Sequence, residues 1–308
     1  MQNLLIAVPY YNNSHFIPLQ IYSCQKYLKN CNWKLLVLDD SNDTTTNVLT
    51  HEKEDIPSVC KKYAEDCIYF KIPQTLHKAS DPAWIRHRDI CTYLVSTVAP
   101  TYAATFDYLM IFDADMCFID TFDFPEIVDN CDIIAPRRKQ WLGDNQCSTK
   151  FKVFDFFWTH CCFFNLKQIA NIHELDLGAV PCTTCDTGSM IYKFMIDNPQ
   201  YKLKFHEFST GNELIEPLNF EFLYNNRIIH FGSGTLWNPD DKHMMGDKYK
   251  YKMDRFIQTV HTGLTETDRE HIAKQNTDIW YPKRKYQLEH PSQYCTPDEF
   301  RQFLSYAR

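Results

Sequence analysis

The sequence lacks an apolar run long enough for a membrane-spanning helix, which needs about 20 residues, and it lacks an excess of basic charge. The formal net charge is −7, from 32 Lys and Arg against 39 Asp and Glu. Proteins that bind polyphosphate chains usually carry a basic face. We therefore expect no membrane span, and the acidic balance disfavours nucleic acid as a partner without excluding it as an acceptor.

The first residues also lack the basic region and the long apolar region of a secretory signal. We therefore expect a cytoplasmic location, in a microbe or in the host cytoplasm if the protein is viral. The 13 cysteines are odd in number and scattered, which in a reducing compartment favours buried thiols over disulfides. A zinc site is the alternative, although its spacing is unorthodox. It would use His160, Cys161 and Cys162 together with Cys182 and Cys185.

Hydrophobic residues make up 44% of the 308 residues, enough for one large domain. Short apolar runs predict strands over residues 4–8, 33–38, 68–72 and 108–112. Helical patterns between them predict helices over residues 15–30, 57–65 and 81–98. Strands that alternate with helices indicate an α/β fold with a parallel sheet.

Beyond residue 130 the pattern is less regular. We expect strands over residues 132–136, 156–165 and 227–231, and a helix over residues 186–196. The tail from residue 232 is polar and looks irregular until a last helix over residues 296–306. A capping box opens that helix, with Thr296 as the cap and Glu299 three residues later.

Asp113 and Asp115 follow the fourth predicted strand, with one residue between them. In an extended segment two such side chains point the same way, and a pair of carboxylates suits a divalent cation that also binds phosphates. Such an ion would neutralise the charge on a diphosphate leaving group. Ligands of parallel α/β sheets bind beyond the carboxyl ends of the strands. Two further polar segments, residues 9–12 and 39–40, also follow strands.

These segments resemble, in order, the motifs of family 2-type glycosyltransferases, which have the GT-A fold. Residues 4–12 resemble their first strand followed by Pro-x-Tyr-Asn, and residues 35–44 resemble their second strand and its acidic segment, one residue short. Arg88-Asp89 stands where the family often has Arg-Asn, and residues 112–115 resemble the DXD motif. The resemblance implies a Rossmann-like, mostly parallel central sheet flanked by helices, with an irregular, partly helical C-terminal extension.

The resemblance also implies roles for single residues. Arg88 would lie near the base or the phosphates. Asp113 would face the ribose or the metal, and Asp115 would bind the metal. The nucleoside would be held by Pro9, Tyr11 and either Asp39 or Asp40. The alternative for Asp39 and Asp40 is a structural role in the turn after the strand, because carboxylates suit turns.

Two later segments complete the predicted site. His230 ends a short apolar strand and resembles the C-terminal metal-ligand histidine of GT-A enzymes. Together with two aspartates it favours Mn²⁺ over Mg²⁺, and Gly232 would let the backbone approach the diphosphate. Asp186 stands where inverting members carry the general base for the acceptor hydroxyl. The other interpretation of Asp186 is a helix cap.

The sequence therefore predicts a metal-dependent glycosyltransferase that moves a sugar from a nucleotide sugar, preferably a UDP-sugar, to a hydroxyl acceptor such as a glycan, with inversion. Residues 1–135 would form the nucleotide-sugar-binding half, residues 136–235 the acceptor-side half, and residues 236–308 an extension packed on the same domain. The alternatives are transfer to a hydroxylated DNA base, a sugar nucleotidyltransferase, or a non-catalytic carbohydrate-binding descendant. A nucleotidyltransferase would ordinarily carry a glycine-rich loop after its first strand, and residues 9–13 contain no glycine.

Overall fold

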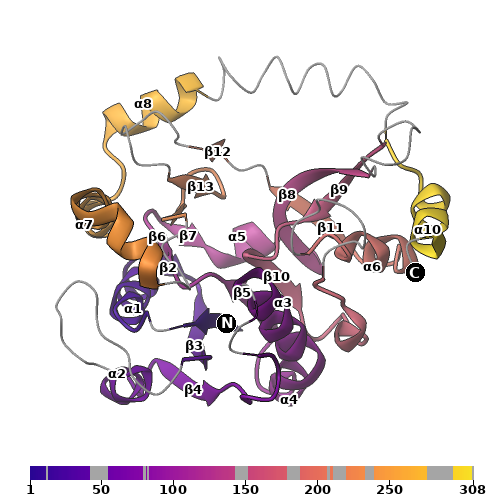
Figure 1. The fold of residues 1–308 in the computed structure, drawn as a ribbon, viewed down its shortest axis with the longest axis horizontal. Helices are drawn as coiled ribbons and strands as arrows, with labels where there is room; N and C mark the ends of the chain where they lie inside the picture. Colours follow the sequence, from indigo (N-terminus) through magenta and orange to yellow (C-terminus); the bar gives the residue numbers. More distant parts are fainter. Residues whose placement is uncertain are drawn as a thin grey trace.

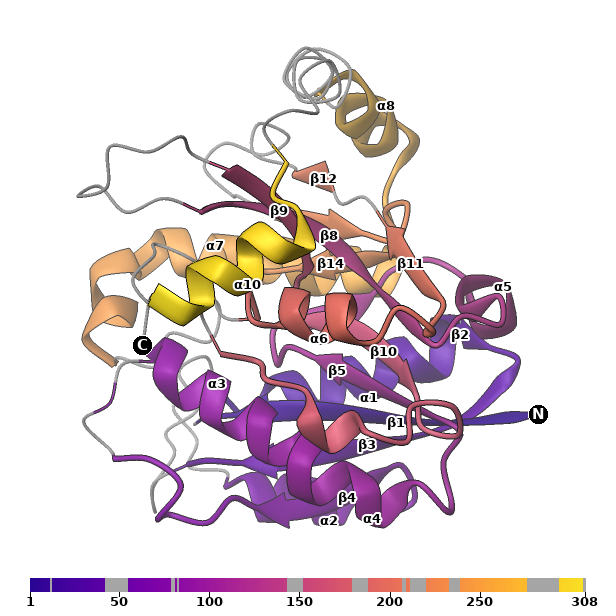
Figure 2. The same ribbon diagram turned by 90° about the vertical axis from the view of Figure 1, so that its right-hand side faces the viewer.

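The computed structural model shows a central sheet with helices on both of its faces (Figures 1 and 2). It describes residues 1–11, 13–41, 55–78, 81, 83–142, 152–178, 188–206, 209–210, 220–232, 239–275 and 294–306.

The predicted strands of the first half are all present and all parallel. They lie in the order β4-β3-β1-β5 and are β1 (Gln2–Tyr10), β3 (Cys31–Asp39), β4 (Cys67–Lys71) and β5 (Tyr108–Phe112). The sheet continues from β5 through β10 (Cys161–Asn165), β8 (Ile133–Leu142) and β11 (Leu203–His206). β10 runs antiparallel to both of its neighbours. The predicted Rossmann-like, mostly parallel α/β sheet is thus confirmed.

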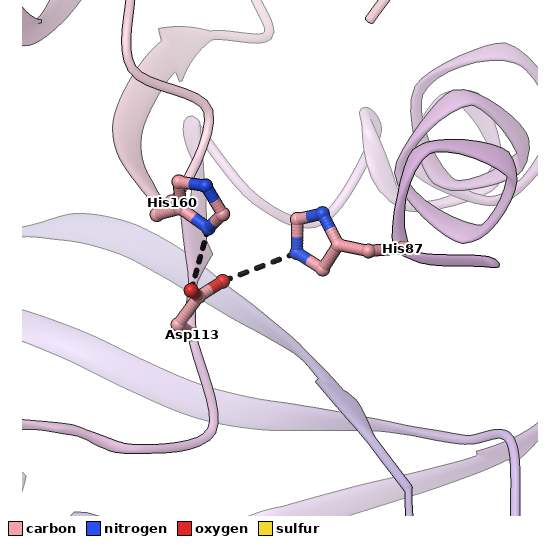
Figure 3. A group of neighbouring side chains, drawn as sticks. All are labelled: His87, Asp113 and His160. Atoms are coloured by element: carbon pink, nitrogen blue, oxygen red, sulfur yellow. Dashed lines mark hydrogen bonds and ion pairs between the residues drawn. The ribbon is translucent and has the colours of Figure 1, made fainter. Parts of the chain in front are cut away.

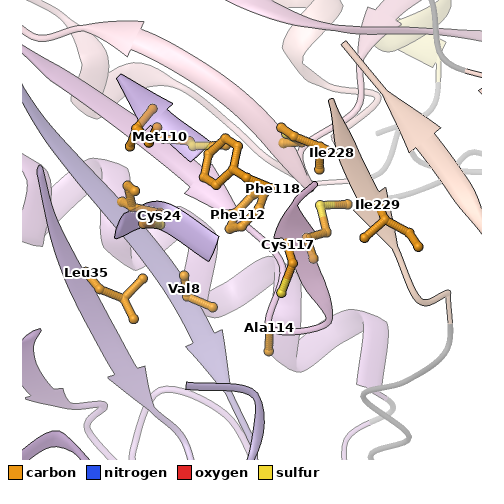
Figure 4. Close-up of a cluster of buried hydrophobic side chains, with 14 of the residues drawn as sticks. Val8, Cys24, Leu35, Met110, Phe112, Ala114, Cys117, Phe118, Ile228 and Ile229 are labelled. Atoms are coloured by element: carbon orange, nitrogen blue, oxygen red, sulfur yellow. The ribbon is translucent and has the colours of Figure 1, made fainter. Parts of the chain in front are cut away.

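Successive side chains of a strand point to opposite faces of the sheet. Both faces of the central strands are apolar, so helices cover both of them. Leu4, Ile6 and Val8 of β1 pack in one core and Leu5 and Ala7 in the other. Figure 4 shows part of the first core, which lies under α1 (Phe16–Tyr27), α2 (Ile56–Lys62) and α7 (Pro239–Thr262). The second core lies under α3 (Ala83–Tyr93), α4 (Ala99–Tyr102) and α6 (Ile191–Asp197).

A small antiparallel sheet adjoins the end of β5. Its strands, in spatial order, are β12 (Ser209–Thr210), β13 (Glu221–Leu223), β14 (Ile228–His230) and β6 (Met116–Phe118). β6 begins one residue after Asp115, so the segment from residue 113 to 115 joins the two sheets. The shorter elements are β2 (Leu28–Lys29), β7 (Phe122–Asp123), α5 (Phe124–Val128) and a 3-10 turn (Ile172–Glu174).

Several predicted boundaries are wrong. The helix expected over residues 186–196 begins at Ile191, with Met190 at its N-cap position, and the strand expected over residues 132–136 extends to Leu142. The single strand expected over residues 156–165 is two strands, β9 (Lys152–Phe157) and β10, separated by residues 158–160. β9 pairs with β8, whereas β10 lies between β8 and β5, so the chain changes partners at the break. The helix expected to end near residue 98 continues through a π-helical turn (Leu94–Val98) into α4. Pro100 is tolerated there because it lies in the first turn of α4.

The tail is more helical than its polar composition predicts. It contains α7, with 24 residues, and α8 (Glu266–Gln275). Helix α7 is mostly polar, but it buries Met253, Phe256 and Val260 at helical spacing.

The last helix, α10 (Pro297–Tyr306), begins as predicted. The Thr296 N–H donates to Glu299 Oε2 over 2.9 Å, and the Glu299 N–H donates to Thr296 Oγ1 over 3.2 Å. This reciprocal pair is the capping box expected from the sequence. Among the described residues, no helix combines the length and the apolar character that a membrane crossing requires.

Candidate metal centre

The Asp113–Asp115 segment is fixed by hydrogen bonds to its backbone. The Gln20 side chain of α1 donates to the carbonyl oxygens of Asp113 (2.8 Å) and Met116 (3.0 Å), and the Tyr10 hydroxyl in turn donates to Gln20. Gln20 and Tyr10 are fully buried. A buried amide with these partners holds the turn in one shape, so both carboxylates are positioned before any ligand binds.

His230 reaches this segment through strand pairing. β14 runs antiparallel to β6 and sets His230 opposite Met116, and the Phe231 N–H donates to the Asp115 carbonyl over 2.9 Å. His230 Nε2 consequently lies 3.1 Å from Asp115 Oδ1 and 4.0 Å from Asp113 Oδ2.

The other ring nitrogen of His230 has a partner of its own. Nδ1 lies 2.7 Å from Glu221 Oε2, because β13 pairs with β14 and sets Glu221 opposite His230. Such an outer partner fixes the ring orientation of a metal-ligating histidine. Burial alone would lower the pKa of His230, but the Asp115 and Glu221 carboxylates prevail and raise its pKa to about 10. Without a metal ion the ring is therefore protonated near neutral pH.

Asp113 also contacts two histidines (Figure 3). The sequence pattern did not point to His87, and it pointed to His160 only as a neighbour of the cysteines in the alternative zinc site. Its Oδ1 lies 3.1 Å from His87 Nε2, and its Oδ2 lies 2.5 Å from His160 Nδ1. Burial alone would raise the pKa of Asp113, but His160 and His87 outweigh it and hold the pKa well below its usual range.

The ligand atoms of Asp113, Asp115 and His230 all lie within 4.8 Å of one another, so this buried group could hold a metal ion. Two carboxylates and one imidazole form a donor set that Mn²⁺ accepts. The group at the end of β5 thus fits the metal that the sequence analysis expects.

The predicted nucleoside-binding residues lie at the same edge of the sheet, because β1 lies between β3 and β5. Pro9 is in β1, and Tyr11 follows that strand. Asp39 accepts hydrogen bonds from the Ser41 N–H (2.9 Å), the Tyr69 hydroxyl (2.8 Å) and the Lys71 ammonium (3.2 Å). Its carboxylate is therefore already occupied by neighbours on β4 and by the turn after β3.

Asp40 is held in a buried ion-pair cluster. Its Oδ1 lies 2.9 Å from His77 Nε2, and its Oδ2 accepts a hydrogen bond from Arg86 over 2.6 Å. Burial raises the pKa of Asp40, and Arg86 and His77 partly oppose that rise. The Arg86 guanidinium also lies over the Tyr11 ring, 4.1 Å from its centroid.

Arg86, rather than the predicted Arg88, is the arginine beside Tyr11 and Asp40. Arg88 instead pairs with Asp89 over 2.6 Å and is partly exposed. The periodicity of α3 could have shown this: the core residue Ile90 lies four positions after Arg86 but only two after Arg88. Likewise, His87 lies four positions before the core residue Cys91, which puts His87 on the buried face of the helix.

Gly232 follows His230 and has a φ of +69°. Lys252 of α7 donates to its carbonyl over 3.0 Å, so α7 contacts the backbone beside the metal group. Asp186 lies outside the described residues, as do Cys182 and Cys185. Cys161 and Cys162 pack into different cores on the two faces of the sheet. These two cysteines therefore cannot ligate one ion, which argues against the zinc site considered above.

No protein-family model and no curated protein matches the chain in sequence. The fold and the geometry of this edge of the sheet are therefore what indicate a function.

Proposed function

We propose that this protein is a metal-dependent glycosyltransferase of the GT-A type. It would move a sugar from a nucleotide sugar, preferably a UDP-sugar, to a hydroxyl acceptor such as a glycan. The observation that carries the proposal is the Asp113, Asp115 and His230 group at the carboxyl end of β5. Two carboxylates one residue apart and a strand-end histidine, at this edge of a mostly parallel sheet, are the ligand set that the GT-A resemblance predicts.

In this proposal Asp113, Asp115 and His230 hold Mn²⁺, and Glu221 keeps the His230 ring turned toward the ion. The bound cation would supply charge neutralisation for the diphosphate leaving group. The nucleoside would lie on the neighbouring strand ends, near Tyr11. Ligands of such sheets bind there, and the Tyr11 ring is already backed by the Arg86 guanidinium.

Catalysis would use Asp186 as the general base. Asp186 takes the proton of the acceptor hydroxyl while the acceptor oxygen attacks the anomeric carbon. The bond from that carbon to the diphosphate oxygen breaks, and the configuration inverts. This step follows from the resemblance and from the suitability of a carboxylate for proton abstraction.

The test is the hydrolysis of a panel of nucleotide sugars by the full-length protein, with Mn²⁺ and with EDTA, beside thermal melting in the same mixtures. We expect one donor to be turned over only when Mn²⁺ is present. The same donor should raise the melting temperature, and by more the tighter it binds. If no nucleotide sugar shifts the melting temperature or is hydrolysed, the proposal is wrong. Release of diphosphate from a sugar phosphate and a nucleoside triphosphate would instead indicate a nucleotidyltransferase.

A further inference from the structure

Three histidines surround Asp113, but the proposed glycosyltransferase site uses only His230. Asp113 Oδ1 faces His87, and Asp113 Oδ2 lies close to His160 and 4.0 Å from His230. The His87 and His160 rings are stacked, with centroids 4.9 Å apart and planes 22° apart. Neither residue belongs to the ligand set described above, so two imidazoles next to a metal-binding carboxylate need an explanation of their own.

The three side chains come from separate parts of the fold. His87 is on α3, Asp113 follows β5, and His160 is in the break between β9 and β10. The Asp113 N–H donates to the His160 carbonyl over 3.0 Å, which fixes the break against the end of β5. Trp158 packs edge-on to the His160 ring, with centroids 4.7 Å apart. Each ring is therefore held with one nitrogen directed at the same carboxylate (Figure 3).

The distances suit coordination by one ion. Ligand nitrogen and oxygen atoms about 2.1 Å from a tetrahedral zinc ion lie about 3.0–3.5 Å from each other. His87 Nε2 and Asp113 Oδ1 are 3.1 Å apart, and all three ligand atoms lie within 4.8 Å of one another. The contact between His160 Nδ1 and Asp113 Oδ2 is shorter, at 2.5 Å. It would have to lengthen by about 0.5–1 Å when both atoms bind one ion.

We propose that His87, Asp113 and His160 form a second cation site, for an ion of the zinc class, and that Asp113 is shared between this site and the Asp113, Asp115 and His230 site. The two donor sets differ in kind. Two imidazoles and one carboxylate favour Zn²⁺ and leave a fourth position open, whereas two carboxylates and one imidazole favour Mn²⁺. A shared carboxylate brings two ions to the same edge of the sheet, as in two-metal sites with a spacing of about 3.5–4 Å.

The proposal is tested by metal binding alone, so it does not depend on the identity of the sugar donor. The full-length protein, stripped with EDTA, is titrated with Co²⁺ and followed by visible absorption, then challenged with Zn²⁺ or with Mn²⁺. We expect two bound equivalents of Co²⁺. One should give the intense band of four-coordinate Co²⁺ and should be displaced by Zn²⁺ but not by Mn²⁺.

Variants assign the two equivalents. His160→Ala and His87→Gln should lose the intense band and bind Zn²⁺ about 100-fold more weakly, the upper end of what even a supporting partner of a ligand contributes. Both should keep the Mn²⁺ site, measured by electron paramagnetic resonance. Asp115→Asn should lose the Mn²⁺ site and keep the intense Co²⁺ band. His173 is exposed, so His173→Ala should change neither site. Far-ultraviolet circular dichroism checks folding. The His160 side chain is less buried than that of His87, so we expect its replacement to disturb the fold less.

One equivalent of Co²⁺ in the wild type would overturn the proposal, as would unchanged Zn²⁺ affinity in folded His160→Ala. His87 and His160 would then be hydrogen-bonding supports of Asp113 only. The two proposals fail separately. The Co²⁺ band without any donor hydrolysis would leave the second site standing and reject the glycosyltransferase. Mn²⁺-dependent hydrolysis with a single metal equivalent would do the opposite.

Discussion

His230 Nε2 lies 3.1 Å from Asp115 Oδ1, although the two residues belong to different strands that are far apart in the sequence. The pairing of β14 with β6 creates this contact, because His230 stands opposite Met116, the residue after Asp115. The metal group is therefore part of a strand register. Ligand affinity and the integrity of the small sheet should change together when that register is disturbed.

Asp115→Asn should abolish Mn²⁺ binding and metal-dependent turnover while the protein stays folded. The substitution keeps the size of the side chain. It removes the repulsion between two neighbouring buried carboxylates, which offsets the loss of the ion pair between Asp115 and His230. Mn²⁺ titration and a melting curve check this. Asp120→Asn is the matched control, since Asp120 is about half exposed and pairs with Arg269 at the surface. Full activity of Asp115→Asn, or of the wild type in EDTA, contradicts the metal-dependent assignment.

Metal binding should strengthen as pH rises, because Mn²⁺ must displace the proton on His230. The carboxylates of Asp115 and Glu221 raise the pKa of that ring to about 10 in the metal-free protein, so binding near neutral pH should release about one proton from His230. Calorimetry in buffers of different ionisation enthalpy measures the release. It should disappear in His230→Gln, and an unchanged proton count in that variant would show that His230 is not a ligand.

The same shift predicts the pH dependence of stability without metal. The folded-state pKa of His230 is about 10, above the ordinary value of about 6.5 in the unfolded chain. Its stabilising contribution is therefore complete below about pH 6.5 and is lost as pH rises to about 10. Denaturant midpoints of the metal-free wild type should fall over this window more steeply than those of His230→Gln. Parallel profiles would contradict the shift.

Arg86→Ala should destabilise the protein by about 3–5 kcal/mol, because it leaves the buried Asp40 carboxylate without its main partner. Arg88→Ala should cost about 1 kcal/mol or less, since Arg88 forms a partly exposed pair with Asp89. Urea unfolding compares the two variants. Equal unfolding midpoints would show that the Arg86–Asp40 pair contributes little to stability. Binding of the nucleotide sugar by each folded variant then tests which arginine contacts the nucleotide.

Gly188→Ala should destabilise the segment that carries His160. A Cβ at Gly188 would lie 2.4 Å from Thr159 Cγ2, and the φ of +91° disfavours any side chain. We expect a cost of about 1–3 kcal/mol and weaker metal binding. Thr159→Ser removes the clashing methyl group, so the double variant should recover part of the loss and keep the backbone cost. If Gly188→Ala alone is neutral, residues 159 and 188 do not constrain each other.

Asp186→Asn should lower turnover by about 10²–10⁴-fold while donor binding persists, if Asp186 is the general base. The helix-cap interpretation is wrong for α6, whose N-cap position is Met190. Any other purely structural role predicts nearly intact turnover, because asparagine keeps the size of the side chain and most of its hydrogen bonds. Turnover measured beside the melting temperature separates the two roles. The linkage of the product, determined by nuclear magnetic resonance, tests inversion independently, and a retained configuration would contradict the single displacement.

The sequence by itself determined the first half of the sheet and the position of Asp113 and Asp115 at its edge. Strands 4–8, 33–38, 68–72 and 108–112 were predictable because each is a short apolar run bounded by polar residues. Parallel strands then direct their carboxyl ends to one edge, so the acidic segments had to gather there. The capping box of Thr296 and Glu299 was also predictable, because its hydrogen bonds join residues only three positions apart.

Only the tertiary structure decided which side chains meet at that edge. The break at residues 158–160 sits inside an apolar stretch, and nothing local shows that the chain changes partners there and brings His160 to Asp113. The choice of Arg86 over Arg88 depends on which face α3 buries against the sheet. Glu221 meets His230 through the register of β13 and β14. Such contacts are long-range, and their geometry is set by packing and strand pairing rather than by the residues next to them in the chain.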